Sequence, residues 1–353
     1  MKKLSMRVLL VGVMGVIGAI AAIGAIGLGV ASAQAPQANP DIDRLDPALD
    51  ALVPQNAKLE ILKADYFGNA EGPVWVQQGP SGYLLFTDIS ANHIYKWTPD
   101  GAISMFLDRT GFNSGDTDSL QTAGYVGGYN GRFYPTSFGS SGTTLDPQGR
   151  IVWCAQGDRS IVRLEKDGKT RTTLADRYQG KRLNRPNDLV AKSDGWIYFT
   201  DPHSTRGQPQ DLDFSGVYRV KDGNLQLLDK EVQPNGLAFS PDEKTFYVGG
   251  EKIWRYDVQP DGTVTNRTII NEVGCDGMKV DIKGNIYCAT AQSHGIRVLT
   301  PQGKHMGTIL TPQDGAGPTN LAFGDADSKT LYITIKRSLA RIRVNVPGVR
   351  PQP

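Results

Sequence analysis

The sequence of 353 residues is poor in the side chains that build soft metal sites and disulfide frameworks. It contains 3 Cys and 4 His, and no Cys-x-x-Cys pair occurs. The odd cysteine count excludes a framework in which every cysteine is paired, and the missing Cys pairs argue against a structural zinc site. We expect Cys154, Cys275 and Cys288 to be buried small apolar residues, with a single disulfide as the open alternative.

The sequence also lacks an excess of one charge and a serine-nucleophile motif. The 38 Lys and Arg are balanced by 36 Asp and Glu, for a formal net charge of +2. This balance excludes a broadly basic protein, so no nucleic-acid partner is expected. No Gly-x-Ser-x-Gly motif occurs, which disfavours a serine hydrolase. The 41 Gly and 21 Pro favour a turn-rich, all-β chain.

A long apolar run occurs at the N-terminus. Met1–Arg7 is basic, Val8–Val30 is apolar, and Ala31–Ala33 forms an Ala-x-Ala cleavage pattern. We interpret residues 1–33 as a signal peptide and residues 34–57 as a linker and lead-in segment. The run is also long enough for an uncleaved membrane anchor. Both interpretations predict export to the periplasm or beyond, and only the anchor would hold the protein at a membrane.

A hairpin pattern recurs six times between residues 58 and 346. Each copy opens on a polar residue, continues as alternating apolar strands and turns at a sequence such as Ser193-Asp194-Gly195. The opening residues are Glu71, Ser141, Asn187, Asn235, Asp276 and Thr319. Four of the five spacings are 41 to 48 residues, close to the roughly 40–50 residues of a four-stranded propeller blade.

The pattern therefore predicts a six-bladed β-propeller. The sixth copy shows three strands, and an isolated strand at 58–66 would complete it, because an open ring would leave an unpaired edge. Residues 347–353 are expected to be a C-terminal tail.

The first spacing, 70 residues, is longer than the others. The excess falls at 108–140, which is rich in Gly, Ser, Tyr and Phe. Two interpretations stay open for this insertion: a solvent-exposed loop, or a lid over the mouth of the channel.

The opening residues are candidates for one metal site. The first residue of each innermost strand lies beside the propeller axis, so these six side chains should meet there. They could be simple turn formers. However, Glu71 is a poor turn former, and two carboxylates across a narrow channel would repel each other without a cation. Two carboxylates and two amides form an oxygen-rich site for a hard divalent ion.

The motifs Glu71–Trp75, Arg185–Asp188, Asn235–Leu237 and Asp276–Met278 resemble those of the SMP-30/gluconolactonase family. The resemblance extends over roughly Lys58 to Val344. It implies a six-bladed propeller and a metal-dependent hydrolase that opens a sugar lactone.

The resemblance also assigns roles to residues at the start of the innermost strands. Glu71, Asn235 and Asp276 match metal ligands of the family. Asn187 matches an asparagine that contacts the metal in some members and the substrate in others, and Arg185 matches an arginine that contacts the sugar. Cys275 stands where many relatives have proline, and the 108–140 insertion differs from the animal proteins, so substrate specificity is not transferred.

The predicted chemistry is ester hydrolysis assisted by one divalent ion. We expect Ca²⁺, with Zn²⁺, Mn²⁺ or Mg²⁺ as alternatives, and Asp276 as the catalytic base for water. Asp188 is a further candidate for substrate contact, as are His203 and His294, which follow the second strands of their copies. A phosphotriesterase-like hydrolase and a non-catalytic ligand-binding propeller remain alternatives, and the oligomeric state stays open.

Overall fold

The computed structural model describes residues 39–113, 127–129, 132–134, 138–203, 210–290, 292–312 and 317–351. The predicted signal peptide or anchor therefore lies outside the described residues, as does most of the 108–140 insertion. Within the described ranges, no helix is long and apolar enough to cross a membrane.

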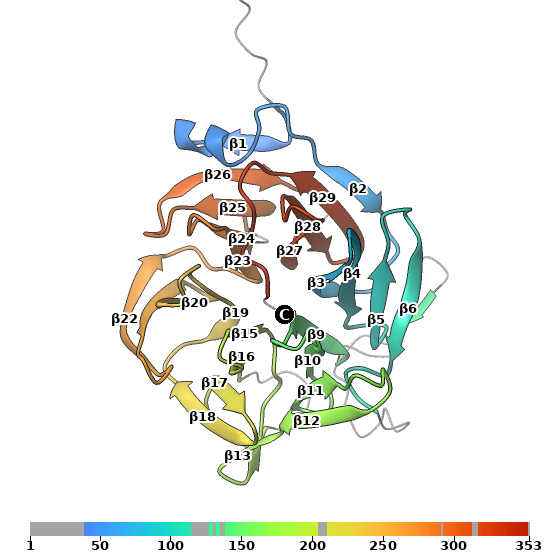
Figure 1. The fold of residues 1–353 in the computed structure, drawn as a ribbon, viewed down its shortest axis with the longest axis vertical. Coiled ribbons are helices and arrows are strands. Elements are labelled where there is room, and N and C mark those ends of the chain that lie inside the picture. The colour runs from blue at the N-terminus through green and yellow to red at the C-terminus, as the bar shows by residue number, and fades with distance from the viewer. Residues whose placement is uncertain are drawn as a thin grey trace, which may run out of the picture. The chain divides into compact units, whose positions relative to one another are not determined.

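Six antiparallel sheets surround a central channel, which confirms the predicted propeller (Figure 1). The first three blades, from the channel outward, are β3 (Ala70–Gln78), β4 (Ser81–Asp88), β5 (His93–Trp97) and β6 (Ile103–Asp108); β9 (Ser140–Leu145), β10 (Ile151–Ala155), β11 (Ser160–Leu164) and β12 (Arg171–Ala175); and β15 (Leu189–Ala191), β16 (Ile197–Asp201), β17 (Gly216–Lys221) and β18 (Asn224–Asp229).

The other three blades continue around the same axis. They are β19 (Pro234–Phe239), β20 (Thr245–Gly250), β21 (Ile253–Val258) and β22 (Val264–Asn271); β23 (Met278–Val280), β24 (Ile286–Thr290), β25 (Gly295–Leu299) and β26 (His305–Leu310); and β27 (Asn320–Gly324), β28 (Thr330–Ile335) and β29 (Ser338–Arg343). Two short hairpins lie outside the blades: β7 (Gly127–Tyr129) with β8 (Arg132–Tyr134), and β13 (Arg177–Tyr178) with β14 (Lys181–Arg182).

Polar turns set the register of the blade hairpins. In the third blade, Gly195 has a φ of 90°, a backbone conformation that favours glycine. Its N–H donates to Lys192 O at 2.9 Å, and the Asp194 carboxylate accepts the Trp196 N–H at 3.2 Å. The turn pairs Ala191 with Ile197, which keeps Leu189 opposite Phe199 in the core.

The ring closes through an N-terminal strand, as predicted. Strand β2 (Glu60–Lys63) pairs with β29, with Ile61 opposite Ala340, and becomes the fourth strand of blade six (Figure 1). On the inner side of the closure, Trp75 of blade one stacks on Tyr332 of blade six with ring centroids 5.4 Å apart. Two contacts therefore close the ring: the pairing of β2 with the edge strand β29, and the aromatic stacking between the first and last blades.

The lead-in segment contains a strand that the sequence did not predict. Strand β1 (Ile42–Arg44) pairs with β26 and gives blade five a fifth strand (Figure 1). A 3-10 helix, η1 (Pro47–Ala51), follows it and is capped by the Asp46 carboxylate. Three residues are too few for strand periodicity to be recognised in a sequence.

The tail beyond residue 346 also packs on the blades. Val349 N donates to Val280 O at 2.9 Å, and the Arg350 guanidinium donates to backbone carbonyls of Asp325 and Ala326. The described part of the tail therefore lies across blades five and six, beside the channel.

The cysteines differ from the preferred expectation. Cys275 and Cys288 form a disulfide, the alternative that stayed open, while Cys154 is free and buried. Cys275 immediately precedes Asp276, and Cys288 lies on the neighbouring strand β24, opposite Met278. The disulfide therefore ties the start of the innermost strand of blade five to the second strand.

Removing β2 should destabilise the ring. A protein that starts at residue 65 would expose the backbone of β29, whereas one that starts at residue 39 keeps both added strands. We expect a lower Tm and concentration-dependent aggregation for the shorter protein only. Thermal unfolding and size-exclusion chromatography measure both effects, and equal stability of the two truncations would contradict the closure.

Candidate active site

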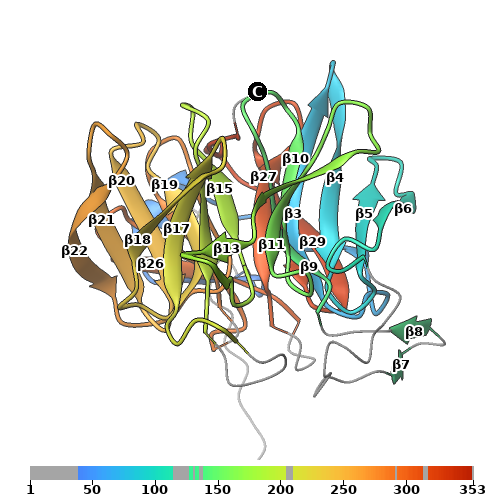
Figure 2. The same cartoon turned by 90° about the horizontal axis from the view of Figure 1, so that it is seen from below.

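The innermost strands begin on the face that carries the β7–β8 hairpin (Figure 2), and backbone hydrogen bonds join neighbouring blades there. There, the glycine after an opening residue donates its N–H to the opening residue of the next blade. The bonds are Gly142 to Asn187 at 2.7 Å, Gly236 to Asp276 at 3.0 Å and Gly277 to Thr319 at 2.8 Å. A Cβ atom on Gly236 would overlap Asp276 O, so this contact requires glycine. We call these hydrogen bonds between neighbouring blades the backbone belt. They bring the opening residues close together.

Five of the six opening side chains form a polar ring at the channel mouth. Ser141 Oγ donates to Asn187 Oδ1 at 3.1 Å, and Asn187 Nδ2 donates to Asn235 Oδ1. Asn235 in turn hydrogen-bonds to Asp276, whose charge acts on Glu71. We call these five residues the mouth ring. The structure thus brings together Glu71, Asn187, Asn235 and Asp276, the four predicted metal ligands.

The two carboxylates of the mouth ring, Glu71 and Asp276, destabilise each other when both are ionised. Glu71 is 7% exposed; its burial raises its pKa, and the charges of Asp276 and Asp188 raise it further. Burial also raises the pKa of Asp276, with Asp188 as the next cause. Either protons or a cation would relieve this repulsion.

A second layer lies one residue further along the strands. Only the third and sixth blades carry a side chain at this position, Asp188 and Asn320, and both are buried. Asn320 Nδ2 donates to Asp188 Oδ2 at 3.1 Å and to Glu71 Oε2 at 3.2 Å. We call Asp188 and Asn320 the axial pair, because they come from opposite blades and meet across the channel. Asp188, predicted to contact substrate, thus lies beneath the mouth ring.

The other four blades have glycine at the second position, and packing explains two of them directly. A Cβ atom on Gly277 would overlap the Asn320 side chain, and one on Gly142 would overlap the Asp188 carboxylate. The glycines therefore leave the space that the axial pair occupies.

In blade six, the side chain that faces the channel is one residue later in the sequence than predicted. Thr319, expected to face the channel, uses its hydroxyl to bind Ala70 O at 2.7 Å and Thr334 Oγ1 at 2.9 Å, joining blade six to blade one. The next residue, Asn320, faces the channel instead. Sequence reasoning missed it because Thr319-Asn320 lacks the glycine that marks the register in the Asn235 and Asp276 copies.

Arg185 stands beside the mouth on a segment held by Asp201. The buried Asp201 carboxylate accepts the N–H groups of Asn184 and Arg185, both at 2.7 Å. In blade one, Asp88 binds Gly68 and Asn69 in the same way, so both aspartates have structural roles. The Arg185 guanidinium lies 5.5 Å from the centre of the Phe138 ring, and burial lowers its pKa. Among the described residues, no ion pair to Arg185 is found.

The two candidate histidines lie on loops that follow second strands. The His203 N–H binds Ser215 Oγ at 2.8 Å, and His294 O accepts from Thr311. His294 Nδ1 is buried and has no hydrogen-bond partner within the described ranges. In that same part of the chain, no hydrogen bond or ion pair connects either imidazole to the mouth ring.

The chemistry of the mouth ring fits a divalent cation. The carboxylates of the buried Glu71 and the half-buried Asp276 have raised pKa values and lie beside the amide groups of Asn187 and Asn235. All four side chains offer hard oxygen donors. Among the described residues, no group of three or more His, Cys, Asp or Glu that could hold a metal is found. Any metal site here would therefore combine carboxylates with amides.

Replacing Asn320 with alanine should destabilise the fold. The substitution leaves the buried carboxylates of Glu71 and Asp188 without their shared donor, so the free energy of unfolding should fall by about 1–3 kcal/mol. Asn224→Ala, at an exposed position, serves as the control and should change it by less than about 0.5 kcal/mol. Denaturant unfolding measures both, and equal effects would show that the axial pair has no stabilising role.

Comparisons with known proteins agree with this geometry. The family model of the SMP-30/Gluconolactonase/LRE-like region matches residues 69–337. Gluconolactonase from Zymomonas mobilis is 32% identical, with 90% of this chain and 91% of that protein covered. The 6-deoxy-6-sulfogluconolactonase of Pseudomonas putida is 29% identical over 79% of this chain and 92% of its own length. A solved gluconolactonase from Xanthomonas campestris is 30% identical, covers 86% of this chain and 94% of its own, and has a TM-score of 0.71. The chain belongs to the SMP-30/gluconolactonase/LRE-like family, and this membership supports a lactone hydrolase.

Proposed function

We propose that the protein is a divalent-metal-dependent lactonase that opens a sugar lactone. The observation that carries the proposal is the mouth ring, in which the carboxylates of Glu71 and Asp276, both with raised pKa values, lie beside two asparagine amides. The family relationship supports the substrate class, because the Zymomonas relative carries the name gluconolactonase.

Glu71, Asn187, Asn235 and Asp276 would hold the ion. All four offer oxygen donors, so Ca²⁺ is the preferred ion, with Mn²⁺, Mg²⁺ or Zn²⁺ as alternatives. When bound, such an ion supplies a Lewis acid that polarises the lactone carbonyl and stabilises negative charge on its oxygen.

Asp276 is the proposed base. It would accept a proton from water as the water oxygen attacks the carbonyl carbon. The ring C–O bond would then break as Asp276 returns the proton to the ring oxygen, which leaves as the hydroxyl of a hydroxy acid. In the metal-free protein, burial and the charge of Asp188 raise the pKa of Asp276. The hydrogen bond from the Gly236 N–H to the Asp276 backbone carbonyl, at 3.0 Å, holds Asp276 at the mouth.

Other residues at the mouth would bind and orient the lactone. Arg185 offers guanidinium donors to hydroxyl groups, and the Asn187 amide lies within the ring itself. His203 and His294 remain proposed contacts from the loops on the same face. The axial pair would act from below, with Asn320 orienting Glu71 rather than contacting substrate.

Removal of metal should abolish activity reversibly. Protein treated with EDTA and freed of chelator should open no gluconolactone, and adding Ca²⁺, Mn²⁺, Mg²⁺ or Zn²⁺ separately should restore activity with at least one ion. Ring opening is followed by acid release in a weakly buffered indicator assay. Full activity after chelation would refute the metal dependence, and turnover of an organophosphate without any lactone would favour the phosphotriesterase alternative.

Asp276→Asn should lower kcat by about 100-fold or more, because the amide cannot accept the proton from water. Asp222→Asn is the matched control, since it makes the same change at an exposed turn and should leave kcat unaltered. Steady-state kinetics with metal present compare the two variants. If Asp276→Asn retained wild-type kcat, another group would have to be the base.

A further inference from the structure

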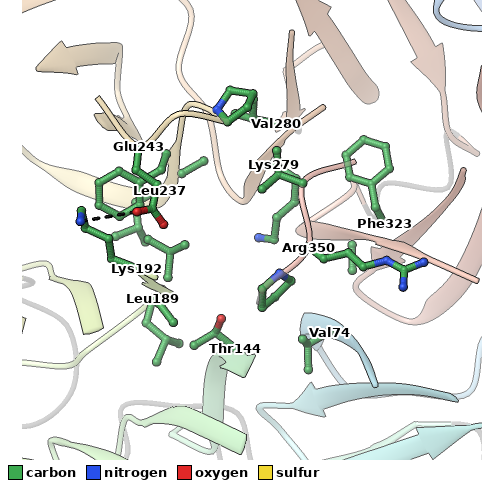
Figure 3. Close-up of a pocket in the computed structure, with 18 of the residues that line it drawn as sticks. Val74, Thr144, Leu189, Lys192, Leu237, Glu243, Lys279, Val280, Phe323 and Arg350 are labelled. Carbon is green, nitrogen blue, oxygen red and sulfur yellow. Dashed lines mark ion pairs between the residues drawn. The ribbon is translucent and has the colours of Figure 1, made fainter. Parts of the chain in front are cut away.

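The central channel contains a cavity of about 370 Å³ on the far side of the axial pair (Figure 3). The innermost strand of every blade contributes to its wall, and the C-terminal residues Val349–Pro351 line one side. Exposed turn residues, among them Ser193 and Asp242, form its rim on the face opposite the mouth ring. Its volume lies within the range of sites for small molecules. We call it the distal cavity.

Two of the three cations around the distal cavity are already engaged. Lys192 forms ion pairs with Asp194 at 2.7 Å and with Glu243 at 3.5 Å, the second of which is drawn in Figure 3. The guanidinium of Arg350 is directed away from the cavity and binds backbone carbonyls of the β27–β28 turn.

Lys279 is different. Its ammonium group projects into the distal cavity (Figure 3) and donates to Met278 O at 3.0 Å and to Asn320 Oδ1 at 3.4 Å. It acts electrostatically on Asp188, but within the described part of the chain it forms no ion pair. An ammonium group has three N–H donors, so Lys279 retains donor capacity toward the cavity.

The remaining wall combines polar and apolar side chains. Among the polar ones, Thr143, Ser193 and Ser240 use their hydroxyl groups to bind Gly72 O, Glu243 and Asp242, respectively. Thr144 directs its hydroxyl into the distal cavity (Figure 3). The apolar side chains that line the cavity are Val74, Leu189, Leu237, Val280 and Phe323. These apolar side chains favour a ligand with an apolar body. The carboxylates of Asp242 and Glu243 lie in the turn at the rim and bind Ser240 and Lys192.

We propose that the distal cavity binds a small monocarboxylate with an apolar body, such as a short aliphatic or aromatic acid. The carboxylate accepts hydrogen bonds from Lys279 Nζ and the Thr144 hydroxyl, and the apolar body packs against Leu189, Leu237 and Phe323. A charge-assisted hydrogen bond to an ammonium that forms no ion pair with any described residue explains the preference for an anion. None of the mouth-ring residues lines the distal cavity, so this site is distinct from the mouth ring.

Isothermal titration of hexanoate into metal-free protein tests the proposal. We expect saturable binding to one site, and at least about tenfold weaker binding of hexanol, which has the same apolar chain without the charge. Lys279→Met should weaken hexanoate binding by a similar factor. Lys283→Met, at an exposed turn, is the matched control and should bind hexanoate as the wild type does.

Two further variants distinguish binding in the distal cavity from binding elsewhere on the protein. Thr144→Val should weaken binding several-fold and provides a second test if Lys279→Met fails to fold. Arg185→Met removes the cation beside the mouth ring and should leave binding intact. The proposal is overturned if hexanol binds as well as hexanoate, if Lys279→Met has no effect, if only Arg185→Met abolishes binding, or if millimolar hexanoate does not bind. Because no metal or lactone is present, none of these outcomes bears on the lactonase proposal.

Discussion

The arrangement depends on the close approach of the innermost strands where they begin. Backbone N–H groups of glycines such as Gly142 and Gly277 reach the carbonyl of the next blade, and a Cβ atom would prevent this approach. The belt narrows the channel until side chains from different blades touch. Polar groups that are far apart in the chain then share one small, poorly hydrated volume, where charges interact strongly.

This confinement has its largest effect on three carboxylates, those of Glu71, Asp188 and Asp276. Each has a pKa raised by burial, and the charge of Asp188 acts on the other two. The amide nitrogen of Asn320 donates hydrogen bonds to both Glu71 and Asp188, and this reduces the repulsion between the two carboxylates. Lys279 lies on the other side of Asn320, so the polar layers and the distal cavity form one continuous axis. The same electrostatics suit the mouth ring to a cation and the distal cavity to an anion.

Much of the architecture could be predicted because it repeats. Turns such as Ser193-Asp194-Gly195 recur at blade spacing, and the family resemblance selected Glu71, Asn235 and Asp276 from the same copies. The prediction was wrong at Thr319, where no glycine follows the opening residue and the channel-facing position is shifted to Asn320. It also missed β1, because three residues carry no detectable period and their pairing with β26 depends on a distant strand.

The sequence by itself determined the number of blades, the strand that closes the ring and the identity of the polar residues that begin the inner strands. Local alternation and turn chemistry encode these features within about 40–50 residues at a time. Only the tertiary structure decided that Asn320 meets Asp188 across the axis, that Cys275 pairs with Cys288, and that Lys279 faces a cavity without an ion pair among the described residues. The contact between Asn320 and Asp188 joins different blades and depends on closure of the whole ring, which no single repeat contains. The disulfide lies within blade five and depends on the pairing of β23 with β24.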